Sequence, residues 1–258
     1  MKYWGMAALL LFGSVQSAGA EDVVIAADSW CPYNCAPGSD QPGYMVEIAA
    51  KAFESAGHRL VYKTMPWARA LAEAEAGRIA GVFGASPEEA GTLIYPKQPL
   101  ARSRNVLAVP VGNPFVWSSV KGLEGMALGV IQDYSYGATL DAYIKANAKD
   151  ASRIQSLSGD APLLGNLRKL MAGRIGATVD DANVLAYTLK AESLGGAIRL
   201  VDMSDSPSPL FIGLSPKLGK ASDYAALLDK TVASLRASGD LAALLARYGV
   251  KDWDKPGS

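Results

Sequence analysis

The chain contains two cysteines, Cys31 and Cys35, whose type and spacing favour one particular chemistry. In a secreted chain, two cysteines so close together are expected to form a disulfide, which holds the intervening loop in one shape. A redox-active dithiol is the alternative interpretation. Such dithiols have two residues between the cysteines and a helix directly after them, whereas here three residues intervene and a Pro-Gly loop follows. We therefore expect a structural disulfide.

Aromatic side chains near this loop are candidates for ligand contact. Trp30 and Tyr33 follow an apolar strand predicted to begin at residues 23–25, and Trp67 opens a predicted helix. Ligands of open α/β sheets bind just beyond the carboxyl ends of strands, where such loops emerge. We predict that these three rings stack against or enclose a ligand. The alternative is that they close the edge of the core.

Arginine side chains are the candidates for holding an anionic group of a ligand. Arg104 lies at the start of a long apolar strand predicted at 103–111, and Arg69 lies in a helix predicted at 67–76. Arg69 has an alternative role, because its spacing from Glu73 permits an exposed i,i+4 ion pair. The sequence leaves both roles open for this residue.

The second half of the chain offers a loop and two adjacent acids. Ser135 and Tyr136 follow a strand predicted at 126–131 and open a helix, where backbone N–H groups point toward an anionic group. Asp180 and Asp181 follow a strand predicted at 175–179. We predict that Ser135 or Tyr136 contacts the ligand together with Asp181, whereas Asp180 caps the next helix.

Composition and motifs exclude several classes of function. The chain has one histidine, His58, and shows no metal-site spacing, nucleophile–base pair or phosphate-binding loop. We predict no cofactor and no metal. The 25 basic and 25 acidic residues balance, which argues against nucleic acid as a partner. The remaining enzymatic alternative is general acid–base catalysis by Glu88, Glu89 or Asp181.

Residues 1–20 have the pattern of a signal peptide. Lys2 supplies a positive start, residues 6–12 form an apolar run, and small residues at 18–20 mark a cleavage site. The apolar run is shorter than the roughly 20 residues that span a bilayer. We expect cleavage after Ala20 and a periplasmic location.

The elements that must position these candidates alternate between strand and helix in both halves of the chain. The sequence Ala-Gly-Arg-Ile occurs at 76–79 and again at 172–175, each time where a predicted helix ends at glycine and a strand begins. This repetition favours two similar α/β lobes.

The order of these motifs resembles that of the bacterial extracellular solute-binding proteins of family 3, the periplasmic components of amino-acid ABC importers. The resemblance covers nearly all of the chain after the signal peptide. It is carried by the sequences WCPY at 30–33, GYMVEIA at 43–49, PWARAL at 66–71, EAGR at 75–78, GLEG at 122–125 and LRASGDLAALLARYG at 235–249.

The resemblance implies an α/β fold of the type II periplasmic binding protein class, with two lobes that are each a sheet flanked by helices. It implies a first lobe at 21–110 and 208–258 and a second at 111–207, with crossings near Pro110–Pro114 and Ser206–Pro209. It also implies a monomer that closes on one small polar ligand and serves an inner-membrane ABC permease. Alternatives on the same fold are a ligand-sensing partner of a membrane receptor and a periplasmic dehydratase or lyase.

One segment departs from the family pattern. Amino-acid binders of the family carry an arginine for the ligand carboxylate in the segment that matches 84–89, where Ser86 is a candidate contact and Glu89 stands in place of the arginine. A carboxylate cannot clamp another carboxylate, which needs a cation. Asp181 matches the family's aspartate for the ligand ammonium. This departure predicts a small polar ligand, amino-acid-like or another amine or polyol, but not a standard amino acid held by the usual arginine.

Overall fold

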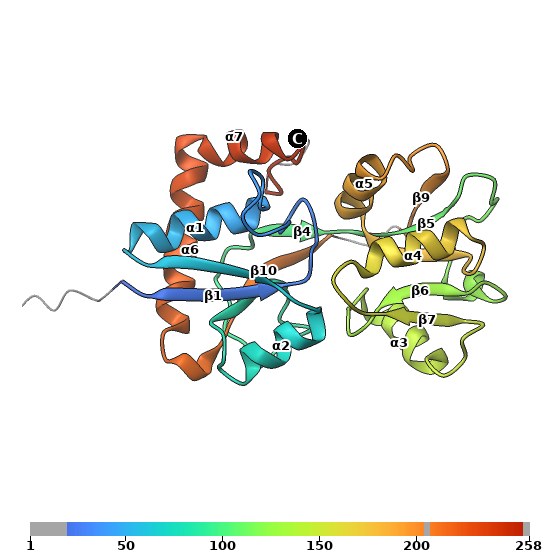
Figure 1. Ribbon diagram of the computed structural model, residues 1–258, viewed down its shortest axis with the longest axis horizontal. Coiled ribbons are helices and arrows are strands. Elements are labelled where there is room, and N and C mark those ends of the chain that lie inside the picture. The colour runs from blue at the N-terminus through green and yellow to red at the C-terminus, as the bar shows by residue number, and fades with distance from the viewer. Residues whose placement is uncertain (1–19, 204–206, 255–258) are drawn as a thin grey trace, which may run out of the picture.

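Two β-sheets, each of five strands, divide the chain into two lobes that lie side by side (Figure 1). The computed structural model describes residues 20–203 and 207–254. The predicted signal peptide, residues 1–20, falls almost wholly outside the described residues. Among the helices that are described, none is both long enough and apolar enough to cross a membrane.

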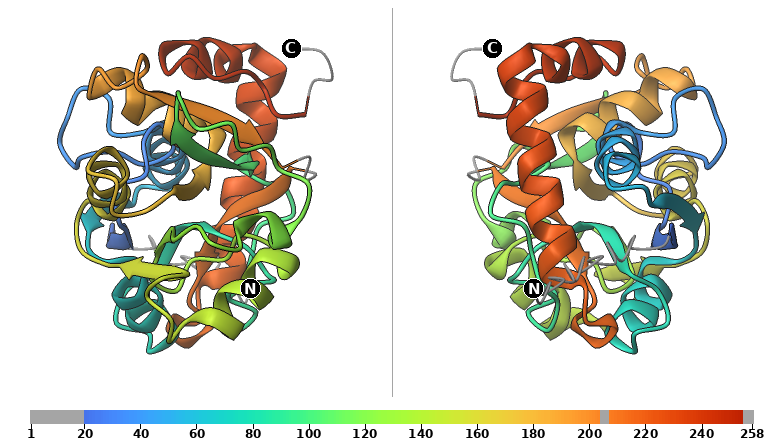
Figure 2. Two further views of the ribbon diagram at one scale, coloured as in Figure 1. Left: turned by 90° about the vertical axis from the view of Figure 1, so that its right-hand side faces the viewer. Right: turned by 90° about the vertical axis from the view of Figure 1, so that its left-hand side faces the viewer.

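The first lobe is built on a sheet with the strand order β2-β1-β3-β10-β4. Strands β1, β2 and β3 run parallel, and β10 runs antiparallel to β3 and β4. The elements of this lobe are β1 (Asp22–Ala27), α1 (Tyr44–Ser55), β2 (Arg59–Thr64), α2 (Trp67–Glu75), β3 (Gly81–Ala85), β4 (Ala101–Ser103), β10 (Ser208–Leu214), the 3-10 helix η2 (Pro216–Leu218), α6 (Ala221–Ser238) and α7 (Asp240–Arg247). The long helix α6 runs along the outer side of this lobe (Figure 2).

The second lobe repeats this plan with the strand order β7-β6-β8-β5-β9. Strands β6, β7 and β8 run parallel, and β5 runs antiparallel to β8 and β9. The elements of this lobe are β5 (Asn105–Pro110), the 3-10 helix η1 (Val120–Leu123), β6 (Leu128–Ile131), α3 (Ala138–Asn147), β7 (Ile154–Leu157), α4 (Pro162–Met171), β8 (Ala177–Asp181), α5 (Ala182–Ala191) and β9 (Ile198–Asp202). The predicted class, two lobes that are each a sheet flanked by helices, is confirmed.

The repeated Ala-Gly-Arg-Ile sequence marks the same place in both lobes. It leads from α2 into β3 and from α4 into β8, and these strands hold equivalent positions in the two sheets. Gly77 and Gly173 have φ angles of +77° and +66°, which end each helix in a left-handed turn. The following Arg78 and Arg174 donate their backbone N–H back to the helix at 2.9 Å in both cases. The sequence repeat therefore encodes a structural repeat.

The first crossing between the lobes lies at Arg104, so the crossing predicted near Pro110–Pro114 is wrong. Strand β4 ends at Ser103 and pairs with β10 in the first sheet, whereas β5 begins at Asn105 and pairs with β8 and β9 in the second. The first lobe thus ends near residue 103 rather than 110. No local pattern in the sequence marks this change of sheet, because both strands are extended and the partners of each strand lie far away in the sequence.

The return crossing lies between β9, which ends at Asp202, and β10, which begins at Ser208. The crossing predicted at Ser206–Pro209 overlaps this stretch, although residues 204–206 lie outside the described part of the chain. The chain therefore changes lobes at Arg104 and again between Asp202 and Ser208, and the two lobes lie side by side (Figure 1).

Candidate functional site

A cavity of about 780 Å³ lies between the two lobes, and residues of both lobes line it. Its volume is typical of sites that enclose a whole small molecule. The aromatic residues on its wall are Trp30, Trp67, Phe83, Trp117, Tyr134 and Tyr136. Aromatic walls around a pocket between two lobes are suited to excluding water from a bound solute.

The charged residues that line the cavity are all acidic. They are Asp28, Glu88, Glu89, Asp141 and Asp180. No lysine, arginine or histidine is among the lining residues in the described parts of the chain. The wall therefore carries carboxylates from both lobes without a basic side chain to compensate them.

Asp180 lies at the end of β8 and faces the cavity with a side chain that is only 1% exposed. Its Oδ1 accepts hydrogen bonds from Trp30 Nε1 of the first lobe at 2.8 Å and from the Asp181 backbone N–H at 2.7 Å. Its Oδ2 is buried and has no hydrogen-bond partner among the residues that the structure describes. A buried acceptor without a donor is costly, so this oxygen is a natural contact for a donor on a ligand.

Asp28 follows β1 directly and lies opposite Asp180 across the lobes. Its Oδ2 accepts a hydrogen bond from Tyr134 Oη of the second lobe at 2.6 Å. Its backbone carbonyl accepts a hydrogen bond from Asn34 Nδ2, also at 2.6 Å. Each lobe therefore donates a hydrogen bond from an aromatic side chain to a buried acid of the other lobe. Trp30 of the first lobe donates to Asp180, and Tyr134 of the second lobe donates to Asp28.

Glu89 lies in the loop after β3 and is held by both lobes. Trp67 Nε1 donates to its Oε1 at 3.1 Å, and the Ser135 backbone N–H of the second lobe also bonds to this carboxyl. The Ser135 hydroxyl donates instead to Asp141 Oδ2 at 2.7 Å, and the Tyr136 N–H donates to Asp141 Oδ1 at 2.8 Å. Ser135 thus stands between two of the carboxylates.

Burial raises the pKa of three cavity acids. The pKa of Asp28 is raised to about 6, that of Glu89 to about 7 and that of Asp180 to about 8, in each case chiefly because desolvation disfavours the charged form. The negative charge of Asp28 contributes to the higher pKa of both Glu89 and Asp180. Such clusters of perturbed acids are typical of functional sites.

These pKa values predict how the stability of the ligand-free protein depends on pH. The folded chain holds protons that the unfolded chain, with acid pKa values of about 4, has already released. Unfolding therefore releases protons, and the free energy of unfolding falls as the pH rises from about 5 to about 9. Thermal unfolding at constant ionic strength should show a falling midpoint across this range. Asp180→Asn should flatten the decline above about pH 7, and a midpoint that rises with pH would contradict the prediction.

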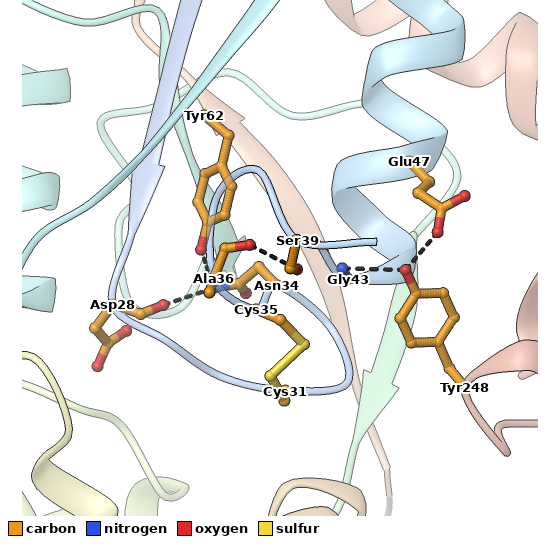
Figure 3. Close-up of a disulfide and its surroundings, with 10 residues drawn as sticks. All are labelled: Asp28, Cys31, Asn34, Cys35, Ala36, Ser39, Gly43, Glu47, Tyr62 and Tyr248. Atoms are coloured by element: carbon orange, nitrogen blue, oxygen red, sulfur yellow. Dashed lines mark hydrogen bonds between the residues drawn. A yellow bond between two sulfur atoms is a disulfide. The ribbon is translucent and has the colours of Figure 1, made fainter. Parts of the chain in front are cut away.

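The predicted disulfide between Cys31 and Cys35 is present and fixes the loop that carries Trp30 (Figure 3). Within the loop, the Trp30 N–H donates to the Asn34 carbonyl at 2.8 Å. Gly43 passes over the loop with a φ of +109°, and a Cβ there would lie 2.4 Å from the Asn34 Cα. Only glycine fits at this close approach. The loop is thereby anchored, and it holds Trp30 and the backbone of Asp28 in place.

Asp181 caps α5 and lies outside the cavity lining, which corrects its predicted role in ligand contact. Its carboxylate accepts hydrogen bonds from the N–H groups of Asn183 and Val184 at 2.8 and 3.1 Å. It also accepts from the Ser103 hydroxyl and the Arg104 N–H, both at 3.0 Å. Protein donors engage the oxygens of Asp181, so Asp181 rather than Asp180 caps α5, and Asp180 rather than Asp181 lines the cavity.

Tyr33 is also a structural residue rather than the predicted ligand contact. It is fully buried, and its Oη donates to Asp181 Oδ1 at 3.0 Å and accepts from Asn183 Nδ2 at 3.0 Å. Its ring stacks beneath that of Trp30, with centroids 4.5 Å apart. Tyr33 therefore supports Trp30 from the core side and ties the disulfide loop to the second lobe.

The two predicted arginine contacts also lie away from the cavity. Arg69 is exposed on α2. Arg104 sits at the crossing, where its Nη1 donates to Asp202 Oδ2 at 2.5 Å. Neither side chain replaces the arginine that the sequence lacks at Glu89, and no arginine or lysine of the described residues lines the cavity in its place.

The other predicted site residues line the cavity: Trp30, Trp67, Ser86, Ser135 and Tyr136. The cavity is also lined by four residues that were not predicted from the sequence: Asp28, Trp117, Tyr134 and Asp141. An acid directly after the first strand is a signal that would have found Asp28, because ligands bind beyond strand ends. Trp117 lies in an irregular segment and had no such signal. Among the described residues, no group of three or more His, Cys, Asp or Glu side chains is placed to hold a metal ion.

The sequence matches one family of known proteins. Residues 23–251 match the family described as bacterial extracellular solute-binding proteins, family 3. No curated protein matches the chain.

Solved structures with the same fold include a protein from a study of glutathione import in Gram-positive bacteria via GshT and the cystine ABC importer TcyBC of Streptococcus mutans. It is 18% identical, with a TM-score of 0.75 over 90% of this chain and 97% of that chain. A substrate-binding protein of an ABC uptake transporter from Streptococcus pneumoniae, solved with bound histidine, is 16% identical, with a TM-score of 0.74 over 91% and 95% of the two chains. A histidine kinase sensor domain is 18% identical, with a TM-score of 0.72 over 90% and 98%.

Proposed function

This chain belongs to the bacterial extracellular solute-binding proteins of family 3, and we propose that it binds a small cationic solute without a carboxylate group and delivers it to an inner-membrane ABC importer. Family members are extracellular or periplasmic, bind small molecules and work with ABC permeases, which supports the general role. The predicted signal peptide fits the same location. The observation that carries the choice of ligand is the cavity wall, which has five carboxylates and no basic side chain in the described chain.

Electrostatics favours a cation in this cavity. Burying an uncompensated carboxylate costs several kcal/mol because the charge loses its hydration. A cationic ligand placed between such carboxylates offsets this cost by attracting them. Asp180 Oδ2 offers an acceptor that has no protein donor. The faces of Trp30, Trp67 and Trp117 add surfaces that attract ammonium and guanidinium groups. The carboxylate of an α-amino acid would find five acids and no basic side chain among the described lining residues, which disfavours the usual ligands of amino-acid binders.

A thermal-shift screen of matched compound pairs tests this proposal. Each pair consists of an α-amino acid and the amine that remains when its carboxylate is removed. We expect the amines to stabilise the protein and the parent amino acids to have little effect. A ligand at 100 times its dissociation constant adds about 2.7 kcal/mol of stability, which corresponds to about 5–10 °C for a chain of this size.

The outcomes of the screen are distinct. Stabilisation by α-amino acids but not by their amines would overturn the proposed ligand class. Recovery of each compound unchanged after incubation is expected of a binding protein, whereas conversion to a product would favour the enzymatic alternative. Stimulation of the partner permease's ATPase activity by the ligand-loaded protein would test delivery separately.

A further inference from the structure

Four of the five acids that line the cavity can be grouped into two pairs by their positions and hydrogen-bond partners. The first acidic pair is Asp28 and Asp180, which are buried and lie on opposite lobes. The second acidic pair is Glu89 and Asp141, which are both bonded to Ser135 and are only partly buried. Each pair thus contains one carboxylate from each lobe.

The side chain of Tyr134 spans the distance between the two pairs. Its Oη donates to Asp28 at 2.6 Å, so this end of the residue lies at the first pair. Its backbone leads directly to Ser135, whose N–H bonds to Glu89 of the second pair. The Tyr134 ring also contacts the Trp67 ring edge-on, at 6.1 Å between centroids, and Trp67 holds Glu89. The contacts of Tyr134 therefore bridge the separation between Asp28 of the first pair and Glu89 of the second with one residue.

From this arrangement we infer that the ligand carries two cationic centres joined by a short hydrocarbon chain, one centre for each acidic pair. The inference rests on the proposed function and specifies its ligand. By ordinary bond lengths, a tyrosine side chain is about as long as a chain of four or five methylene groups. An α,ω-diamine of that length therefore matches the separation.

Three observations support two centres rather than one. A single cation at either pair would leave the other pair of carboxylates uncompensated between the lobes. Asp180 Oδ2, which is buried without a donor, is suited to one of the three N–H donors of an ammonium group. The aromatic rings of Trp67 and Tyr134 lie between the pairs and offer apolar contact to a hydrocarbon chain. The cavity volume of about 780 Å³ leaves room for such a chain.

Calorimetric titration with amines of equal chain length tests this inference. The probes are 1,4-diaminobutane and 1,5-diaminopentane, each compared with butylamine or pentylamine at pH 8 and constant ionic strength. We expect each diamine to bind about 10–100-fold more tightly than the matching monoamine, the range for one additional hydrogen bond to a charged group. Equal affinities would overturn the inference of two centres and leave the proposed cationic ligand class standing. Failure of all four probes to bind would also overturn this inference, whereas the proposed ligand class is overturned by the outcome of the thermal-shift screen described above.

The variant Glu89→Gln tests whether the second cationic centre of the ligand binds at the second acidic pair. This variant should reduce the preference for the diamine from about 10–100-fold to about 1–3-fold, because the second pair then offers a weaker contact to the second cation. Glu54→Gln is the matched control, since Glu54 is exposed on α1 and away from the cavity, and it should retain the full preference. A Glu89→Gln protein that melts like the parent and keeps the full preference would overturn the assignment.

Discussion

Asp180→Asn should lower the affinity for a cationic ligand by about 10–100-fold and leave the fold intact. The substitution keeps the shape of the side chain, and the amide oxygen still accepts the bonds from Trp30 Nε1 and the Asp181 N–H. It removes the negative charge, and it replaces the unpartnered Oδ2 with a donor that repels an ammonium group. Titration of the parent and the variant with the best amine from the screen measures this effect.

The stability of Asp180→Asn provides a second, independent measurement. Because a buried carboxylate with a raised pKa is costly to ionise, the variant should melt at least as high as the parent at pH 8. Asp40→Asn makes the same chemical change in the exposed stretch that follows the disulfide loop and should alter neither affinity nor melting. Unchanged affinity in Asp180→Asn, together with a strongly lowered melting point, would show that Asp180 is structural.

Asp181→Asn should have the opposite profile and lower the free energy of unfolding by about 3 kcal/mol. An amide presents N–H donors to the Ser103 hydroxyl or the Arg104 N–H, and these donors then lose their acceptor. The cap of α5 is also weakened, because an amide oxygen is a poorer acceptor than a carboxylate. For a chain of this length, a loss of that size lowers the melting midpoint by about 6–12 °C.

Two comparisons identify the cause of the lower stability expected of Asp181→Asn. Ligand affinity of Asp181→Asn, measured well below its melting point, should stay within about threefold of the parent, since the side chain does not line the cavity. Asp223→Asn is the matched control, because Asp223 lies exposed in the first turn of α6 and should contribute only a few tenths of a kcal/mol. If Asp181→Asn abolishes binding without loss of stability, then Asp181 contacts the ligand as the sequence predicted.

Local patterns in the sequence determined the fold class, the disulfide and the repeat of the two lobes. Each of these features depends on residues that are near each other in the chain. Cys31 and Cys35 are four positions apart, and the helix ends at Gly77 and Gly173 require only glycine at the right place. The alternation of strand and helix is likewise visible without knowledge of which strands pair. The acid at Glu89, where a family arginine was expected, also pointed to a ligand other than an amino acid.

The tertiary structure alone decided which acid faces the cavity and where the chain changes lobes. Successive side chains of a strand point to opposite faces, so an error of one residue at the end of β8 exchanges the roles of Asp180 and Asp181. The crossing at Arg104 interrupts no pattern, because the residues on both sides are extended and differ only in their distant partners. The cavity itself combines Asp28, Glu89 and Asp180 from two lobes. Their shared electrostatic environment depends on long-range packing, which no short stretch of sequence encodes.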